Sequence, residues 1–140
     1  MTEMGSPREI LLVDDDVLDA AILRRVFRDL GWANRLVHMT DGRQVLAYLK
    51  GRDGETPGVI LLDLNMPNMT GFEFLERIKA DDGLQGIPVV VVTTSDERQD
   101  RAKSFALGAA AYVVKSLCYD EFRQSIRAIG SYLAPAAARI

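Results

Sequence analysis

Short apolar runs and longer amphipathic segments alternate five times along the chain. The apolar runs have the composition of β-strands, and each is followed by apolar residues at helical spacing. Strands are expected at about 9–14, 35–40, 58–63, 88–93 and 110–115. Helices are expected at about 17–30, 42–50, 71–81, 97–108 and 118–133. This alternation predicts a parallel α/β sheet with crossover helices on both faces.

The element ends carry recognisable signals. Runs 10–13, 59–62 and 89–92 are almost wholly apolar, which is typical of central strands covered on both faces. Asp16 is expected to cap the first helix, with Asp19 completing a capping-box-like arrangement. Four glycines are expected to end helices in the left-handed conformation: Gly31, Gly51, Gly83 and Gly108. The last helix shows a buried stripe of Phe122, Ile126, Ile129 and Leu133, and Pro135 is expected to end it.

The length and composition fit one globular domain. The chain has 140 residues, of which 48% are hydrophobic, and leaves no room for a second domain, so no output domain is expected. We expect a disordered N-terminus at 1–7, the domain at 8–133 and a tail at 134–140.

Charge and residue counts exclude several functions. The net charge is −3, with no basic block interleaved with aromatics, so nucleic acid binding is not expected. No apolar run is long enough for a membrane span and the start lacks a secretory signal, so we expect a cytoplasmic protein. One cysteine and one histidine exclude an internal disulfide and a zinc cluster. Cys118 is interpreted as a small packing residue, and His38 as a half-exposed strand residue.

Chemistry-bearing residues follow the predicted strands. Asp14 and Asp15 follow the first, Asp63 the third, Thr93 ends the fourth and Lys115 the fifth. Ligands of open parallel sheets bind outside the carboxyl ends of the strands, so these residues are expected to form one site. Two carboxylates about 4 Å apart repel by roughly 4 kcal/mol at an effective dielectric near 20. Protons, arginines or a hard cation could neutralise them, and magnesium or calcium suits this oxygen-rich set better than zinc.

The set has a coherent chemical interpretation. Magnesium binds carboxylates together with phosphate oxygens, a hydroxyl and an ammonium can bind further phosphoryl oxygens, and an aspartate can be the nucleophile. Taken singly, Asp16 is more simply a helix cap, and Thr93 or Lys115 an ordinary strand-end residue. Their joint occurrence favours a phosphoryl site.

Four separated motifs resemble the receiver domain of two-component response regulators. They are Val13-Asp14-Asp15, Asp63-Leu64-Asn65-Met66-Pro67 with Gly71, Thr93-Thr94, and Tyr112-Val113-Val114-Lys115. The resemblance covers about residues 8–133 and keeps the family's order and spacing. It implies a flavodoxin-like (βα)5 fold with strand order 2-1-3-4-5.

The resemblance also implies a role for each site residue. Asp63 would accept the phosphoryl group from a histidine kinase, and Mg2+ would be bound by Asp15, Asp63 and the backbone carbonyl of Asn65, with Asp14 acting through water. Lys115 would pair with the acceptor carboxylate or the phosphoryl group. Thr93 would close on a phosphoryl oxygen and Tyr112 would change rotamer with it, which is a population shift driven by one charge change. No enzyme activity is expected beyond self-catalysed phosphorylation and dephosphorylation.

One position departs from the family pattern. Ser116 follows Lys115, where the family usually has a proline, often in a cis peptide. Together with Thr93-Thr94-Ser95 and the C-terminal extension, this feature is similar to small stand-alone regulators that partner bacterial phytochromes. A bacteriophytochrome is therefore an expected kinase partner.

Two surfaces are expected to bind proteins. The first helix has a wide apolar arc, and we expect its edge near the acids, including Leu23 and Phe27, to dock the kinase; deep burial is the alternative. Tyr119, Tyr132, the tail and Ile140 are expected to form a homodimer through the last helix, and a frayed tail is the alternative. The downstream protein partner is unknown.

Two other functions compete with the phosphoacceptor. Haloacid-dehalogenase-type phosphatases use an Asp-x-Asp pair, which Asp14 and Asp16 could imitate, but Asp63 would then have no role and a cap domain would be missing. A receiver that only dimerises without phosphorylation is the other alternative. The intact set of acids, threonine and lysine argues against it.

Overall fold

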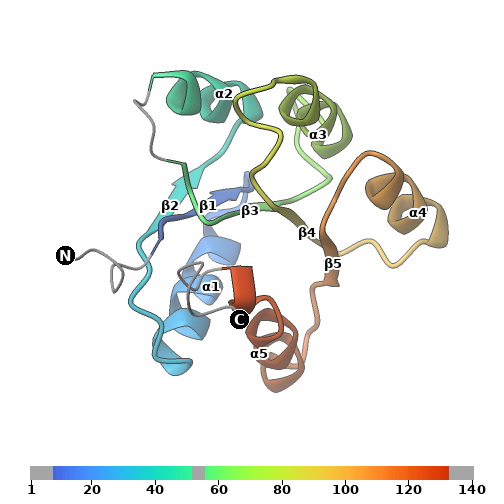
Figure 1. Cartoon of the computed structure of the whole chain (residues 1–140). Coiled ribbons are helices and arrows are strands. Elements are labelled where there is room, and N and C mark those ends of the chain that lie inside the picture. Colours follow the sequence, from blue (N-terminus) through green and yellow to red (C-terminus); the bar gives the residue numbers. More distant parts are fainter. Residues whose placement is uncertain (1–7, 52–55, 133–140) are drawn as a thin grey trace.

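Five parallel strands form one sheet at the centre of the molecule (Figure 1). The structure is a computed structural model that describes residues 8–51 and 56–132. The strands are β1 (Ile10–Val13), β2 (Leu36–Met39), β3 (Val59–Leu62), β4 (Val89–Thr93) and β5 (Ala111–Val114). Their order is β2-β1-β3-β4-β5, which confirms the flavodoxin-like topology predicted from the sequence.

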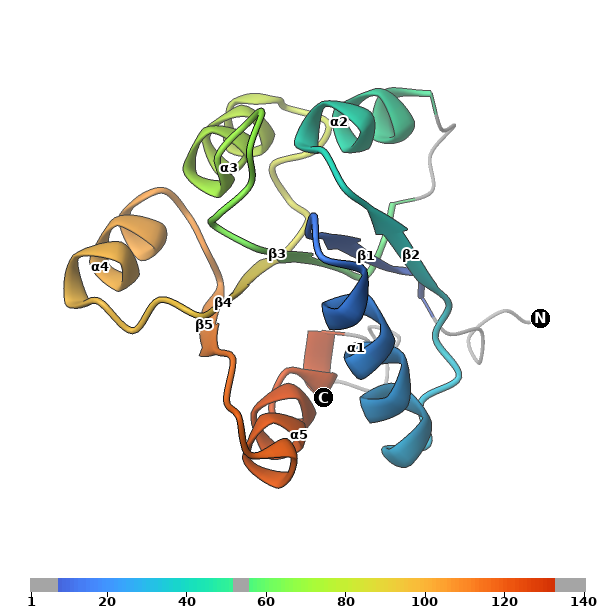
Figure 2. The ribbon, with the colours of Figure 1, turned by 180° about the vertical axis from the view of Figure 1, so that it is seen from behind.

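The helices form a layer on each face of the sheet. They are α1 (Val17–Asp29), α2 (Gly42–Lys50), α3 (Gly71–Ala80), α4 (Arg98–Ala106) and α5 (Tyr119–Arg127), followed by a short 3-10 turn, η2 (Gly130–Tyr132). Helices α1 and α5 lie on one face, and α2, α3 and α4 lie on the other (Figures 1 and 2). Both faces of the central strands are therefore covered, which explains their unbroken apolar runs.

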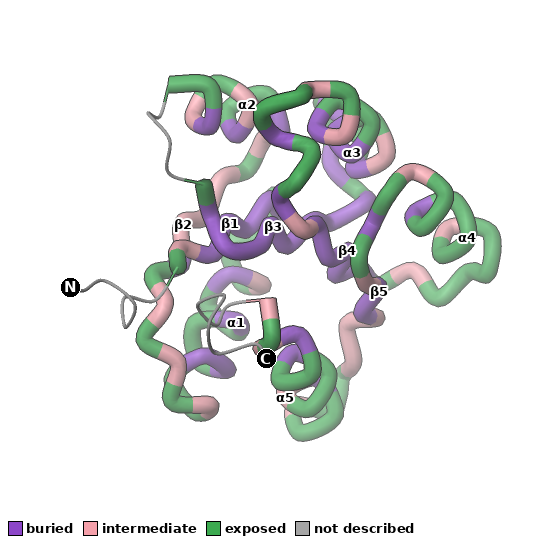
Figure 3. Tube along the Cα trace, viewed as in Figure 1, coloured by how far each residue is buried: buried purple, intermediate pink, exposed green. Residues whose placement is uncertain are grey.

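The register aligns the acid-bearing strand ends. Val13 of β1 pairs with Leu62 of β3, so Asp14 and Asp63 leave the sheet at the same level. The backbone N–H of Asp63 donates to the carbonyl of Val13 at 2.9 Å, which continues the ladder by one residue. The burial map shows the central strands as an almost continuous buried band (Figure 3). The two acids are thus placed at the edge of the most deeply buried part of the fold.

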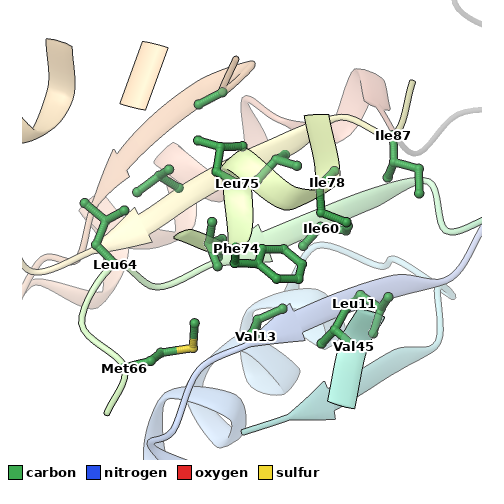
Figure 4. Packing of buried hydrophobic residues seen from close by; sticks show 14 of the residues in the cluster. Leu11, Val13, Val45, Ile60, Leu64, Met66, Phe74, Leu75, Ile78 and Ile87 are labelled. Carbon is green, nitrogen blue, oxygen red and sulfur yellow. The ribbon is translucent and has the colours of Figure 1, made fainter. Parts of the chain in front are cut away.

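Two apolar clusters hold the layers together. The cluster under α2 and α3 is built around Phe74, which is fully buried against residues of the sheet (Figure 4). The opposite cluster is formed by α1 and α5 with the other sheet face, and it includes Phe122, Ile126 and Ile129 of the predicted stripe. At about 25 cal/mol per Å² of buried apolar surface, these clusters are the main source of stability.

The helix ends agree with the predictions at two of four glycines. Gly31 and Gly108 have φ values of 74° and 107°, so they adopt the predicted left-handed conformation. Gly51 was predicted wrongly: its φ is −84°, because α2 ends in an ordinary right-handed turn. Gly83 was also predicted wrongly, since the Asp81 carboxylate accepts from the Gly83 N–H at 2.9 Å and makes the turn itself.

The last helix is shorter than expected. It ends at Arg127, and Gly130 follows in the 3-10 turn with its Cα facing the Trp32 ring, where a Cβ would approach to 3.1 Å. A glycine at this point weakens a helix and permits the close contact with Trp32. The predicted N-terminus 1–7, Leu133, Pro135 and the tail 134–140 lie outside the described residues.

Candidate functional site

Three carboxylates meet at the ends of β1 and β3. Asp14 and Asp63 are buried, while Asp15 beside them is exposed. One ligand oxygen from each lies within 4.8 Å of the others. The structure therefore brings together the three acids that the sequence predicted, with one of them open to solvent.

Burial dominates the electrostatics of the two inner acids. It raises the pKa of Asp14 to about 6, although the Asp16 N–H at 2.9 Å and Lys115 favour the charged form. Burial also raises the pKa of Asp63, opposed by the charge of Lys115 and by the Asn65 N–H at 3.3 Å. Both carboxylates are thus short of positive charge in the protein alone.

The Lys115 side chain extends along the carboxyl edge of the sheet to Asp14 and Asp63. It follows β5, which is separated from β1 by β3 and β4. Its Nζ lies 3.0 Å from Asp14 Oδ2 and 3.8 Å from Asp63 Oδ2. Burial lowers the pKa of Lys115, but hydrogen bonds to acids raise it more, so the net pKa lies above its ordinary value. The lysine thus places a positive charge close to both buried carboxylates.

Asp19 is a member of the site that the sequence reasoning missed. Its Oδ2 accepts from Lys115 Nζ at 2.6 Å. The predicted capping box with Asp16 is absent from the described contacts of α1: Asp16 caps the helix through the Leu18 N–H at 2.8 Å, and Asp19 turns to the lysine. A signal was available, because helical side chains lean toward the helix N-terminus and Asp19 lies in the first turn.

Thr93 and Tyr112 lie on the β4 and β5 side of the site. Thr93 is fully buried, and its Oγ1 accepts from the Ser95 N–H at 3.3 Å. The Tyr112 hydroxyl donates to the Ser95 carbonyl at 2.9 Å, with the Arg101 guanidinium 4.7 Å from the ring centroid. The Ser95 hydroxyl also contacts Asp100 at 2.6 Å. The loop after β4 therefore links the buried threonine to the tyrosine.

Gly71 permits a close turn beside Asp63. A Cβ on Gly71 would lie 2.6 Å from the Asp63 carbonyl oxygen and 2.7 Å from Leu64 Cα, distances that real side chains do not reach. The Gly71 N–H donates to the Leu64 carbonyl at 3.0 Å, which closes the loop that carries Asn65. This glycine therefore sets the course of the chain after β3.

The donor set fits a hard divalent cation. All three clustered acids offer oxygen ligands, and the exposed position of Asp15 leaves room for water on one side. Such an ion would supply the positive charge that Asp14 and Asp63 lack. The cluster is thus a candidate divalent metal site.

Four further positions differ from or refine the predictions. Leu23 and Phe27 are buried, so their expected docking role is wrong and deep burial is correct for them. Cys118 is exposed, because it precedes α5 rather than packing beneath it. His38 is half-buried as predicted, with Nε2 2.6 Å from the Asp14 carbonyl oxygen.

The loop after Lys115 and the start of α1 border a pocket. The described residues contain no cis peptide, so the bond between Lys115 and Ser116 is trans. A pocket of about 190 Å³ lies beside it, with Leu23, Thr94 and Leu117 in its lining. Leu117 is fully exposed, and Val17, Leu18 and Ile22 of α1 are exposed as well. Exposed apolar side chains therefore lie at the start of α1 and in the loop after Lys115, and Ile22 and Leu117 among them line the pocket.

Comparisons with known proteins agree with this geometry. A family model described as response regulator receiver domain matches residues 10–127. The response regulator Rcp1 of Synechocystis sp. is 34% identical over 135 residues, covering 93% of this chain and 91% of Rcp1. A solved structure of Rcp1 in its Mn(2+)-bound form covers 93% of this chain and 96% of that chain, with a TM-score of 0.79 and 32% identity.

Two further solved structures are similar over most of their length. The phosphorylated cyanobacterial phytochrome response regulator RcpA has a TM-score of 0.80 and 32% identity, covering 90% of this chain and 93% of that chain. The bacteriophytochrome response regulator AtBRR has a TM-score of 0.72 and 37% identity, covering 88% and 92%. Among the described residues, no helix is both long and apolar enough to cross a membrane.

Proposed function

This chain belongs to the response regulator receiver domain family and is a response regulator, and from that premise we propose that Asp63 is its phosphoryl acceptor. The observation that carries the proposal is the position of Asp63, which is buried beside two further acids with Lys115 Nζ 3.8 Å away. Receiver domains partner with histidine kinases, so a phosphohistidine is the proposed donor. That donor is formed with ATP inside the cell, and we propose a cytoplasmic location for the same reason.

The proposed reaction is a phosphoryl transfer between two carriers. An Asp63 carboxylate oxygen forms a bond to phosphorus, and the bond from phosphorus to the donor nitrogen breaks. The electron pair leaves with the imidazole of the donor. Hydrolysis restores the unphosphorylated protein: a water oxygen bonds to phosphorus, and the bond from phosphorus to the Asp63 oxygen breaks. The electron pair returns to the Asp63 carboxylate, and inorganic phosphate and a proton are released. Because the chain itself is the acceptor, we propose no turnover of external substrates.

The residues around Asp63 have separate proposed roles. Asp15, Asp63 and the Asn65 carbonyl would bind Mg2+, with Asp14 acting through water, and the ion would neutralise charge on the phosphoryl oxygens. Lys115 would bind another phosphoryl oxygen. Thr93 would bind a third, and the hydrogen-bonded loop from Ser95 would pass that change to Tyr112. We propose that a downstream protein binds the surface formed by β5 and α5, with an affinity that depends on whether Asp63 is phosphorylated.

One experiment tests the acceptor. The protein is incubated with Mg2+ and acetyl phosphate, and its intact mass is followed. One acid-stable, base-labile phosphoryl adduct per chain is expected, and it should be absent in Asp63→Asn. Release of many phosphates per protein would favour a phosphatase instead. That alternative is already weakened, because the Asp16 carboxylate caps α1 and does not join the acid cluster.

A phytochrome-type kinase is the proposed donor protein. The support is the similarity to RcpA and AtBRR, which are themselves phytochrome response regulators by name. We propose that the kinase docks on exposed apolar side chains, namely Ile22 and Leu117, which line the pocket, together with Val17 and Leu18 at the start of α1. This surface replaces the buried Leu23 and Phe27 of the sequence prediction.

The docking proposal has a two-donor test. Leu117→Glu should slow transfer from the kinase, because a charge in the interface is costly to desolvate, while acetyl phosphate still modifies Asp63 at the normal rate. Phe105→Glu, at an exposed apolar residue of α4, is the matched control. Equal slowing with both donors would contradict a docking role for Leu117.

We also propose a homodimer through α5 and the chain that follows it. A groove of about 490 Å³ runs along β5 and α5 and is lined in part by Val114, Ala128 and Tyr132, which are half-buried or exposed and give a partner some apolar surface. The tail that should reach across lies outside the described residues. Light scattering of the full chain and of a truncation after Tyr132 tests this. An unchanged dimer mass after truncation would show that the tail is not needed for the dimer. A monomeric full chain would contradict the dimer proposal.

A further inference from the structure

Asp19 makes the shortest recorded contact of Lys115, although the family resemblance gives it no role. The Nζ to Oδ2 distance is 2.6 Å for Asp19, compared with 3.0 Å for Asp14 and 3.8 Å for Asp63. The side chains of Lys115 and Asp19 are 14% and 23% exposed, so solvent screens their interaction only in part. The pair joins residues 96 positions apart, from the start of α1 and the end of β5.

This contact leaves the proposed nucleophile without a hydrogen bond from the lysine. Asp14 and Asp19 accept hydrogen bonds from Lys115 Nζ at 3.0 and 2.6 Å, whereas Asp63 Oδ2, at 3.8 Å, lies beyond hydrogen-bond distance. Asp63 Oδ1 accepts from the Asn65 N–H instead. In the unphosphorylated protein, Lys115 is therefore hydrogen-bonded to the two acids beside the acceptor and not to the acceptor itself.

The lysine side chain is flexible enough to reach the acceptor, because Asp63 Oδ2 lies 3.8 Å from its Nζ. Asp19 and Lys115 line the same pocket of about 190 Å³, which is otherwise mainly apolar. The flexible four-carbon stem of a lysine allows its ammonium to shift by about 1 Å without moving the backbone. In a phosphoryl transfer, charge spreads over three phosphoryl oxygens, and a nearby ammonium stabilises it. Any such shift lengthens the bond to Asp19.

We propose that Asp19 is a positioning residue that restrains Lys115 and so slows phosphoryl transfer to Asp63. This inference rests on the proposed role of Asp63 as acceptor. Asp19 competes with the phosphoryl group for the ammonium, and it does so through a charged hydrogen bond, which is about twice as strong as a neutral one. An asparagine at this position keeps the shape of the side chain and weakens the competition.

A double-mutant cycle tests the inference. Adduct formation from acetyl phosphate at saturating Mg2+ is timed by intact mass for the wild type, Asp19→Asn, Lys115→Gln and the double variant. Asp19→Asn should accelerate adduct formation by about tenfold, the size of coupling that contacting residues show. In the Lys115→Gln background the same exchange should change the rate less than about twofold. Asp19→Glu, which keeps the charge, should stay near the wild-type rate.

The matched control is Asp29→Asn, an acid at the other end of α1 that contacts Tyr119 and Arg25. Its rate should equal that of the wild type. An unchanged or slower rate in Asp19→Asn overturns the inference, and so does equal acceleration in both lysine backgrounds, which would indicate a general effect of charge on the anionic donor. Failure of the proposed function looks different, because the wild type would then form no adduct, or Asp63→Asn would keep it.

Discussion

Keeping the buried Asp14 carboxylate ionised lowers the stability of the fold, and a cation bound beside it would reduce that destabilisation. The side chain is 1% exposed, and burial raises its pKa from 3.8 to about 6. The folded protein therefore binds this proton more tightly than the unfolded chain does. The stabilisation from the bound proton is fully present below about pH 4 and is lost as the pH rises through about 6.

We predict that Asp14→Asn reduces the pH dependence of stability in the metal-free protein. A rise from 3.8 to about 6 corresponds to about 3 kcal/mol, by which the wild type should lose stability relative to the variant between pH 4 and pH 7. Urea unfolding in the presence of EDTA measures this difference. Part of the slope should remain in the variant, because burial also raises the pKa of Asp63. Parallel curves for the two proteins would contradict the prediction.

Gly71 is expected to tolerate no side chain. We predict that Gly71→Ala destabilises the fold by about 1–3 kcal/mol, because its Cβ would meet the Asp63 carbonyl and Leu64 Cα at 2.6 and 2.7 Å. The displaced backbone should also slow adduct formation at Asp63. Gly86→Ala is the matched control, since a Cβ there has nothing within 4 Å, and it should be neutral or slightly stabilising. Similar unfolding midpoints for both variants would contradict the steric argument.

The predictability of individual site residues depended on what positions them. Asp14 and Asp63 were predictable, because parallel strands end at one sheet edge and each acid directly follows an apolar run. For Asp19 only the direction was predictable, from its place in the first helical turn. Its partner was not, since Lys115 is distant in sequence and an aspartate at this position fits a helix cap equally well. The local sequence predicts the position of a residue in its strand or helix, whereas the residue that its side chain contacts depends on tertiary packing.

Helix α3 starts with the strongest cap among the described helices. The Thr70 hydroxyl accepts from the Glu73 N–H at 3.2 Å, and the Glu73 carboxylate accepts from the Thr70 N–H at 2.9 Å. We predict that Thr70→Ala destabilises the fold by about 1 kcal/mol, whereas Thr70→Ser keeps most of the stability. Urea unfolding of both variants and of Thr40→Ala, at an exposed threonine, provides the comparison. Equal stability of Thr70→Ala and Thr70→Ser would mean that the capping box contributes little.

Element boundaries were predicted unevenly for a physical reason. Strand ends agree within about one residue, and in β1, β3 and β4 the reason is that burial on both faces makes the apolar run and the strand coincide. Helix ends at Gly51 and Gly83 were wrong in conformation, since a right-handed turn or the Asp81 side chain can satisfy the last backbone groups equally well. The end of α5 depended on the contact between Gly130 and Trp32, which only the folded molecule contains.

At the scale of the whole molecule, folding and ion binding are linked. Strand order brings residues from both ends of the chain to one site, with Asp14 and Lys115 joined across 101 positions. The unfolded chain cannot assemble that set. A cation that binds only the folded state therefore stabilises the whole domain by mass action.

We predict that Mg2+ raises the melting temperature at pH 7 through the acid cluster. At about 100 times its dissociation constant an ion contributes about 2.7 kcal/mol, which corresponds to a rise of about 10 °C for a domain of this size. Asp15→Asn should remove most of this rise, because it removes one ligand from the cluster. Asp16→Asn is the matched control, because asparagine caps a helix as well as aspartate does. The Asp16 carboxylate accepts from the Leu18 N–H and is not a member of the acid cluster. If Mg2+ no longer raises the melting temperature of Asp16→Asn, or still raises that of Asp15→Asn, the ion is not bound by the predicted ligands.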